Sequence, residues 1–386
     1  MTTSRQPVLH RLRDRIDANS DLYARNVFAR LFAASPGLRD HFPVDMTLMR
    51  AGFLDLLDHV LEVLPGEDGH TDLIELLAQY GRDNRKYGYT DATYDQLCQI
   101  LITESAAVMG PEWTAEAADT VGQAMLLTTG VMRGAAQSVE GPPTWQAQVV
   151  QKFAINRDRA VIRLKALDGL PDYQPGQYVE TMIPQCPNVW RDLSPALPPN
   201  AAGEMEFHVR AITGGEVSPF IVKDTQVGDV WSFAQAHGTL HVEPERPVLM
   251  LAGGSGLAPL RALLLEMAHR ADSPPTHLYY GARFPGELYD LGALSRLAAT
   301  NPWLTVTGVV DETADPWWVD GAPDPRQWGV QILAGPVGDV AAASGDWRGH
   351  QVLIAGPPGM IDASTRRLLA AGVPPEQIQH DPVHDY

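Results

Sequence analysis

The spacing of apolar residues changes twice along this chain, and each change constrains the fold. Between residues 21 and 137 apolar side chains recur about every 3.6 residues, which is typical of amphipathic helices. From residue 145 the period falls to two, and after about residue 245 short apolar runs no longer alternate with polar residues. With 386 residues, the chain is also longer than one hydrophobic core usually serves. The sequence therefore predicts three domains.

Proline and glycine divide the first part into helices. Breaks fall at residues 35–37, 65–66 and 110–111, where the fixed φ of proline or the freedom of glycine ends a helix. Five or six helices are expected. The segment Gly-Pro-Pro-Thr at residues 141–144 is typical of a short stiff linker, so we place an all-α domain at residues 1–140.

The middle part has the pattern of an antiparallel sheet. Its clearest strand covers residues 204–212, where apolar side chains such as Phe207 alternate with polar ones, including Glu206 and His208. We expect one face of this strand to be buried and the other to be exposed to water. Further short strands separated by turn signals predict a small antiparallel β-barrel over residues 144–244.

The last part, residues 245–386, has the pattern of a parallel α/β domain. Short apolar runs without alternation are typical of strands buried on both faces, and helical patterns follow at least three of them. These runs are residues 248–251, 277–280, 305–310 and 352–355.

The first and last of these runs continue into glycine turns, at residues 253–256 and 356–359. Backbone amides at such a turn can hold a pyrophosphate, because glycine lets the phosphates approach and the following helix N-terminus carries partial positive charge. An ordinary strand-to-helix turn has the same pattern, and neither segment is the G-x-G-x-x-G fingerprint. Both turns are expected at the carboxyl edge of one sheet, which favours a shared nucleotide site.

Five motifs in a fixed order carry a resemblance to a known family. They are GQY at residues 176–178, RDLS at 191–194, VGD at 227–229, GGSGLAP at 253–259 and AGPPGM at 355–360. Over residues 145–381 the chain resembles a ferredoxin-reductase-type FAD/NAD(P)H module. With its helical first part, the whole chain resembles a flavohaemoglobin, a family whose globin domain binds haem and detoxifies nitric oxide with electrons from FAD. The resemblance implies a globin-like domain, an FAD-binding barrel and an NAD(P)-binding domain.

The resemblance also implies cofactor-binding roles for individual residues. Tyr178 would contact the isoalloxazine or ribityl part of FAD, Arg191 its diphosphate, and Ser194 the region of flavin N5, so Tyr178 and Ser194 are the catalytic candidates. Leu193 stands where relatives have an aromatic residue that stacks on the flavin. The other residues expected to contact FAD or NAD(P)H are Val217, Ser218, Gly253, Gly254, Ser255, Gly256, Arg283, Gly356, Pro357 and Pro358.

Three further positions bear on the nucleotide and the flavin. Arg283 follows an apolar strand and could pair with the 2′-phosphate of NADPH or be a charged loop residue, so the choice between NADH and NADPH stays open. Ala355 stands where many relatives have a cysteine near the nicotinamide. Tyr386 ends the chain, as does the flavin-stacking tyrosine of plant-type ferredoxin reductases, although a frayed terminus is the simpler interpretation.

In the helical part, the family's haem-binding positions hold different residues. Asn84 replaces the proximal histidine, and a carboxamide is a poor ligand for haem iron. Phe28 and Met49 stand where a distal tyrosine and glutamine are expected, whereas Phe42 and Tyr94 match the family. We therefore expect a globin-like domain without normally ligated haem, and we predict no metal site.

Composition excludes several classes of partner. Forty-seven acidic against 29 basic residues give a formal charge of −18, with no basic cluster that would favour nucleic acid. The sequence contains no apolar run long enough for a membrane span. The two cysteines, Cys98 and Cys186, are too few for a disulfide framework or a thiolate metal site, and residues 1–10 lack the apolar core of a signal peptide. We expect a cytoplasmic protein.

Three functional hypotheses follow. The leading one is an oxidoreductase that passes hydride from NAD(P)H to FAD and then electrons to an unknown small-molecule acceptor. The second is a haem-containing flavohaemoprotein, a nitric oxide dioxygenase with unusual ligation. The third is a sensor or ligand-binding protein that holds an apolar molecule in the globin pocket and has a vestigial reductase half.

Overall fold

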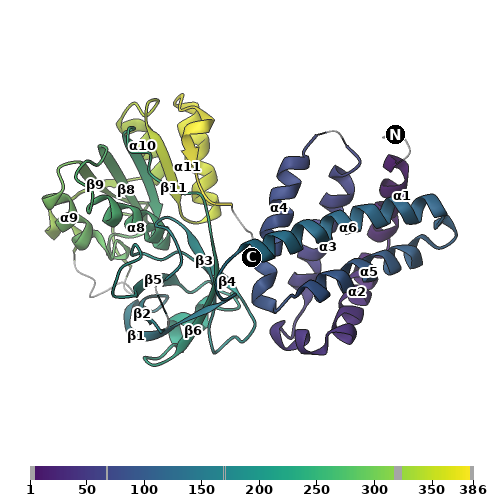
Figure 1. The fold of residues 1–386 in the computed structure, drawn as a ribbon. Coiled ribbons are helices and arrows are strands. Elements are labelled where there is room, and N and C mark those ends of the chain that lie inside the picture. The colour runs from purple at the N-terminus through teal and green to yellow at the C-terminus, as the bar shows by residue number, and fades with distance from the viewer. Residues whose placement is uncertain (1–4, 67, 168, 170, 317–323, 383–386) are drawn as a thin grey trace. The chain divides into compact units, whose positions relative to one another are not determined.

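The structure is a computed structural model that describes residues 5–66, 68–167, 169, 171–316 and 324–382. The chain divides into two compact units, residues 1–144 and residues 145–386 (Figure 1). Tyr386 lies outside the described residues. Among the described helices, none is both long enough and apolar enough to cross a membrane.

The first unit is helical, as predicted. Helices α2, α3 and α5 end one or two residues before the three predicted breaks, whereas α1 lies ahead of the region in which we expected helices. The α-helices are α1 (Arg5–Asp17), α2 (Ser20–Ala34), α3 (Thr47–Val63), α4 (His70–Asp83), α5 (Asp91–Met109) and α6 (Ala115–Ser138), with short 3₁₀ turns at Pro36–His41, Asn84–Tyr87 and Gly110–Glu112.

The second unit begins with an antiparallel sheet of strand order β4-β3-β6-β1-β2-β5. Pro195, just after β4, forms an isolated antiparallel bridge with Phe207 of β5, so the two ends of this strand order are joined at one point. A closed barrel remains our proposal for this sheet. Its elements are β1 (Trp145–Asn156), β2 (Arg159–Ala166), β3 (Tyr178–Met182), β4 (Arg191–Leu193), β5 (Glu204–Arg210), β6 (Val230–His237) and the short helix α7 (Ser218–Lys223).

A parallel sheet follows, with strand order β10-β9-β8-β7-β11-β12. Its central strands are buried on both faces, because Met250 packs into one apolar cluster and its neighbours Leu249 and Leu251 pack into another. The elements are β7 (Val248–Gly253), α8 (Leu257–Met267), β8 (Thr276–Ala282), α9 (Leu291–Thr300), β9 (Leu304–Val310), β10 (Gln331–Ala334), α10 (Val337–Ser344), β11 (Gln351–Ala355), α11 (Pro358–Ala370) and β12 (Ile378–Gln379).

Strand β5 corrects one sequence-based prediction. Phe207 is buried as expected, but Glu206 and His208, which we expected on a water-exposed face, are only 3% and 8% exposed. The strand is covered on both faces, because residues of α8 and of the segment before α9 contact the side that carries these two polar residues. Alternation in the sequence revealed the strand but not what covers its second face.

The order of the parallel strands places the two glycine turns side by side. From β7 the chain proceeds through β8 and β9 to one edge of the sheet, and it then returns to add β11 on the other side of β7. Residues 351–355 of β11 pair in parallel with residues 248–252 of β7. In parallel sheets, ligands bind outside the carboxyl ends of the strands at such a reversal of strand order.

In the helical unit, Gly81 allows helices α4 and α6 to cross at a short distance. A Cβ atom added to Gly81 would collide with the backbone carbonyl of Met132, so only glycine fits at this crossing. We expect Gly81→Ala to destabilise the helical unit by about 1–3 kcal/mol, since the two backbones must separate. Urea unfolding of the full chain, followed by far-ultraviolet circular dichroism, measures this change.

Gly134 on α6 provides the matched control. It is exposed, and an added Cβ would meet no atom within 4 Å. Gly134→Ala should be neutral or stabilise the helix by about 0.5–1 kcal/mol, because alanine loses less backbone entropy than glycine on folding. Equal unfolding curves for the two variants would show that the close crossing at Gly81 is unimportant.

Candidate functional site

The two glycine turns are in direct backbone contact. A Cβ atom on Gly256 would collide with the carbonyl group of Ala355 and the Cα atom of Gly356. A Cβ atom on Gly356 would in turn lie 3.2 Å from the Cα atom of Gly253. The turns are this close because they follow paired strands. Larger residues at these positions would push the turns apart.

A pocket of about 420 Å³ opens beside the joined turns. One wall comes from the antiparallel sheet and contains Tyr178, Leu193 and Ser194, which the sequence assigned to the flavin. The opposite wall is formed by the two glycine turns, which the sequence assigned to the nucleotide. The predicted site residues that line this pocket are Tyr178, Leu193, Ser194, Gly253, Gly254, Ser255, Gly256, Gly356, Pro357 and Pro358.

Three predicted flavin residues do not line this pocket. The guanidinium of Arg191 donates to Glu216 Oε2 at 2.5 Å and to the carbonyl oxygen of Trp190 at 2.7 Å. Val217 is 2% exposed, and its side chain packs in the core of the antiparallel sheet. The hydroxyl of Ser218 accepts a hydrogen bond from the backbone amide of Ile212 at 3.1 Å. A diphosphate at Arg191 would therefore compete with Glu216.

A second pocket of about 910 Å³ shares Arg210, Gly253, Gly254 and Pro357 with the first. Arg283 lies in its wall, pairs with Glu312 Oε1 at 3.1 Å, and places its guanidinium 5.0 Å from the ring centre of Phe284. The lining contains further residues of both signs of charge, namely Arg157, Asp158, Arg159, Arg210, Glu287, Asp311, Asp339, Arg366 and Arg367. This mixture of charges leaves the choice of nucleotide open.

Asp381 also lines the smaller pocket, although we did not single it out from the sequence. Its carboxylate accepts a hydrogen bond from the backbone amide of Thr239 at 3.3 Å. Burial raises the pKa of Asp381 to about 6, against the opposing effect of that hydrogen bond. No local pattern marks Asp381, because it reaches the pocket only through the pairing of β12 with β11.

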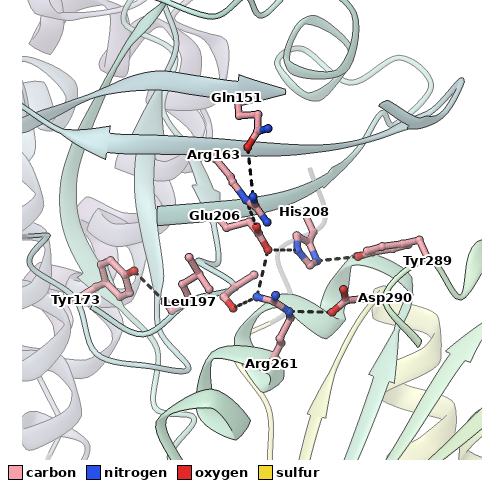
Figure 2. A network of polar contacts seen from close by, with 10 residues as sticks. Gln151, Arg163, Tyr173, Leu197, Glu206, His208, Arg261, Tyr289 and Asp290 are labelled. Carbon is pink, nitrogen blue, oxygen red and sulfur yellow. Dashed lines mark hydrogen bonds and ion pairs between the residues drawn. The ribbon is translucent and has the colours of Figure 1, made fainter. Parts of the chain in front are cut away.

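Behind the smaller pocket lies a buried polar network centred on Glu206 (Figure 2). Its carboxylate accepts a hydrogen bond from Arg163 Nε at 2.6 Å and lies 3.0 Å from His208 Nε2 and 3.2 Å from Arg261 Nη1. Burial alone would raise the pKa of Glu206, but the hydrogen bond from His208 and the charge of Arg261 lower it to about 2. Glu206 is therefore ionised at neutral pH.

Tyr289 and Asp290 also belong to this network. His208 Nδ1 lies 3.0 Å from the hydroxyl of Tyr289, so both ring nitrogens of His208 have partners. Arg261 Nε donates to Asp290 Oδ2 at 2.8 Å. Burial raises the pKa of Asp290, and the charge of Arg261 opposes that rise. Sequence reasoning overlooked Arg261, Tyr289 and Asp290, because nothing in the local pattern links them to Glu206.

In the helical unit, aromatic side chains gather at the predicted globin pocket. Phe28 of α2 and Phe42 are both buried, with ring centres 6.0 Å apart. The ring of Phe42 stacks on Tyr87 at 4.6 Å with an interplanar angle of 20°. The hydroxyl of Tyr87 donates to Met49 Sδ at 3.7 Å. Tyr87 thus covers a face of Phe42 that a porphyrin would need.

The predicted proximal position is also occupied by local contacts. Tyr94 is buried, and its hydroxyl donates to the carbonyl oxygen of Gly81 at 3.1 Å. Burial raises the pKa of Tyr94 to about 12, against the effect of its hydrogen bond with Asn84. Because Asn84 offers a carboxamide rather than an imidazole, and because Tyr87 covers Phe42, these residues do not fit a haem group.

Comparison with known families identifies the two parts of the second unit. Residues 146–242 match the model of the oxidoreductase FAD-binding domain. Residues 250–366 match the model of the oxidoreductase NAD-binding domain. The two matched segments contain the lining of the smaller pocket except Asp381 and Pro382.

Curated relatives match half of this chain or more. The reductase component DmpP of phenol 2-monooxygenase from Pseudomonas sp. (strain CF600) is 33% identical over 53% of this chain and 55% of its own length. A ferredoxin–NAD(P)⁺ reductase component of the naphthalene 1,2-dioxygenase system from Pseudomonas putida is 27% identical over 78% of this chain and 81% of its own. The chain covers only 55–63% of the length of the first four curated relatives.

Solved structures extend the likeness to the fold. The ferredoxin reductase in carbazole 1,9a-dioxygenase is 28% identical, with a TM-score of 0.52 over 62% of this chain and 70% of its own. A flavohaemoglobin from Malassezia yamatoensis, with bound FAD and haem, is 15% identical, with a TM-score of 0.73 over 98% of both chains. At that identity the second match concerns the fold alone. The second unit therefore contains a segment similar to the oxidoreductase FAD-binding domain, followed by one similar to the oxidoreductase NAD-binding domain.

Proposed function

We propose that this chain is an oxidoreductase that takes hydride from NAD(P)H onto FAD and passes the electrons to a protein acceptor. The observation that carries this proposal is the pocket whose lining comes from both matched segments and contains Tyr178 and Ser194 together with the glycine turns. FAD, when bound, would supply the two-electron chemistry. We propose residues 144–244 as the FAD-binding domain and residues 245–386 as the NAD(P)-binding domain.

The chain's own residues would bind and orient both cofactors. The backbone amides of the glycine turns would hold the nucleotide pyrophosphate, because no Cβ atom of residues 253–254 blocks their approach. Ser194 would donate a hydrogen bond toward the flavin ring, and Tyr178 would pack against it. Leu193 would replace the aromatic ring of relatives with an aliphatic contact, and Ala355 would provide a small apolar contact near the nicotinamide.

A protein acceptor is favoured over a small molecule by the relatives. Those named above are reductase components of monooxygenase and dioxygenase systems, and one is named as a ferredoxin–NAD(P)⁺ reductase component. We infer that a ferredoxin or an oxygenase component receives the electrons here. Electron transfer to a small dye but not to any added ferredoxin would favour the small-molecule acceptor that we first expected.

For the helical unit we propose a globin-like fold that does not hold normally ligated haem. The stacking of Tyr87 on Phe42 and the carboxamide of Asn84 at the predicted proximal position support this proposal. A nitric oxide dioxygenase with unusual ligation is the second candidate, since the flavohaemoglobin fold match extends over both units. An apolar ligand in the helical unit, with a vestigial reductase half, is the third.

The absorption spectrum of purified protein separates these candidates. We expect flavin bands without a stoichiometric Soret band, because the flavin-side pocket is formed whereas the helical unit has aromatic side chains where haem would pack. A full Soret band would support the dioxygenase, and the absence of both signals would support the ligand-binding protein.

A pair of variants tests why haem would be excluded. Asn84→His alone supplies an imidazole, but we expect little gain in haemin binding while Tyr87 still stacks on Phe42. Adding Tyr87→Ala to Asn84→His should allow haemin to bind, as measured by a titration followed at the Soret band. Strong binding by Asn84→His alone would show that Tyr87 is not the obstacle.

The glycine turn can be tested through Gly254. A Cβ atom there would meet no protein atom within 4 Å and would project into the space proposed for the pyrophosphate. We expect Gly254→Val to raise the Michaelis constant for NAD(P)H on the order of tenfold, equivalent to about 1.4 kcal/mol of lost binding. Bound FAD should remain at the wild-type level.

A matched control removes the effect of backbone strain in this test. Gly254 has a φ of 55°, and Gly329, which lines neither pocket described above, has a similar φ of 70° with no atom within 4 Å of an added Cβ. Gly329→Val should therefore cause similar local strain without changing the Michaelis constant. If both variants raise it equally, strain rather than nucleotide contact explains the effect.

If Arg191 binds the FAD diphosphate, substitutions of Arg191 and of its partner Glu216 should have opposite effects on FAD binding. Arg191→Ala should weaken FAD binding on the order of ten- to hundredfold, which corresponds to about 1.5–3 kcal/mol for a charge-assisted hydrogen bond. Glu216→Gln removes the ion pair with Arg191 and should leave FAD binding equal or stronger. Flavin fluorescence at limiting FAD measures both, and unchanged binding in Arg191→Ala would place this residue outside the FAD site.

A further inference from the structure

Arg261 connects the two walls of the smaller pocket. It lies on α8, whose first residue, Leu257, directly follows the glycine turn, so at 1.5 Å per residue Arg261 is only about 6 Å along the helix from that turn. The helix is a rigid extension of the turn. A displacement of Arg261 would therefore also displace residues 254–256.

The guanidinium of Arg261 bonds to the flavin-side wall at two points. Nη1 donates to the carbonyl oxygen of Ala196 at 2.7 Å, two residues after Ser194. The same nitrogen lies 3.2 Å from Glu206 Oε1 on β5. Ala196 and Glu206 are themselves joined, since the amide of Ala196 donates to the carbonyl oxygen of Glu206 at 2.7 Å. Arg261 thus binds the segment that carries Ser194.

The other side of Arg261 is fixed within the nucleotide domain. Nε donates to Asp290, the residue before α9, at 2.8 Å, and only 14% of the Arg261 side chain is exposed (Figure 2). His208 also lines the pocket, and Glu206 and Tyr289 hold its ring on both sides. A planar fork with donors in several directions can make all these contacts at once, which an ammonium group cannot do with the same geometry.

We propose that Arg261 is a positioning residue for hydride transfer. It fixes the distance between the nucleotide turn and the flavin-side wall. This role rests on the proposed function. Arg261 itself would contact neither cofactor. It sets the separation between the turn and Ser194, and hydride transfer is sensitive to that separation because the reacting atoms must approach to about 3–3.5 Å. Asp290 and Glu206 orient its guanidinium.

The test compares Arg261→Lys and Arg261→Gln with Arg163→Gln. Arg163 also binds Glu206, but it lies on β2, the strand paired with β5, so its loss removes a cation within one sheet rather than a link between the two walls. The protein is used as FAD-loaded full-length chain. The first readout is the change in flavin absorbance when oxidised protein is titrated with NAD⁺, which reports nicotinamide placement without turnover. The second is the limiting rate of flavin reduction by NADH and NADPH in stopped flow.

We expect both Arg261 variants to bind NAD⁺ with a dissociation constant within about threefold of the wild-type value. Their flavin difference spectrum should be smaller, and their rate of flavin reduction should be at least about tenfold lower, equivalent to about 1.4 kcal/mol. Arg163→Gln should keep the wild-type spectrum and rate within about twofold. Arg261→Lys keeps the buried positive charge, so it remains informative if Arg261→Gln does not fold.

Two results would overturn this role. One is a wild-type difference spectrum and rate in Arg261→Lys, and the other is an equal loss in Arg163→Gln, which would indicate a general effect of perturbing Glu206. Failure of the proposed function has a different signature, because then neither NADH nor NADPH reduces the flavin of the wild-type protein at all.

Discussion

The parallel pairing of β7 with β11 is the constraint on which the candidate site depends. It brings two strand-to-helix turns, about a hundred residues apart in the chain, into backbone contact. Gly256 is needed because a Cβ atom there would collide with the backbone of Ala355 and Gly356, whereas a Cβ atom at Gly253 or Gly356 would first press on the end of the Met360 side chain. A phosphate can approach backbone amides only where side chains are absent, so the same residues that allow the contact also form the candidate nucleotide wall.

The second constraint is electrostatic. Glu206 and Asp290 are carboxylates held away from water, and removing one partner of such a buried pair usually costs about 3–5 kcal/mol because the other charge is left uncompensated. Arg261 serves both carboxylates and also a backbone carbonyl. The antiparallel and parallel sheets of the second unit are therefore joined by directional contacts, which favour a single arrangement of the two sheets.

The helical unit is stabilised by a different kind of contact. Its core joins aromatic rings to one another, as in the stack of Phe42 on Tyr87, and its tyrosine hydroxyls bond to backbone and to Met49. Such contacts stabilise an interior in which aromatic rings pack against one another. A fold shared with a haem-binding protein is thus compatible with a different interior, because packing density and helix crossings, such as the one at Gly81, determine the fold, whereas the ligand needs particular side chains.

The sequence alone determined the features that depend on neighbours along the chain. The helix breaks, the principal strands and the two glycine turns were predicted because period, proline and glycine act locally. Tertiary structure decided the burial of Glu206 and His208, the pairing of Arg191 with Glu216, and the cover of Tyr87 over Phe42. Each depends on a partner brought from elsewhere in the fold. A local pattern shows which side chains are polar or aromatic, but only the packed chain decides what faces them.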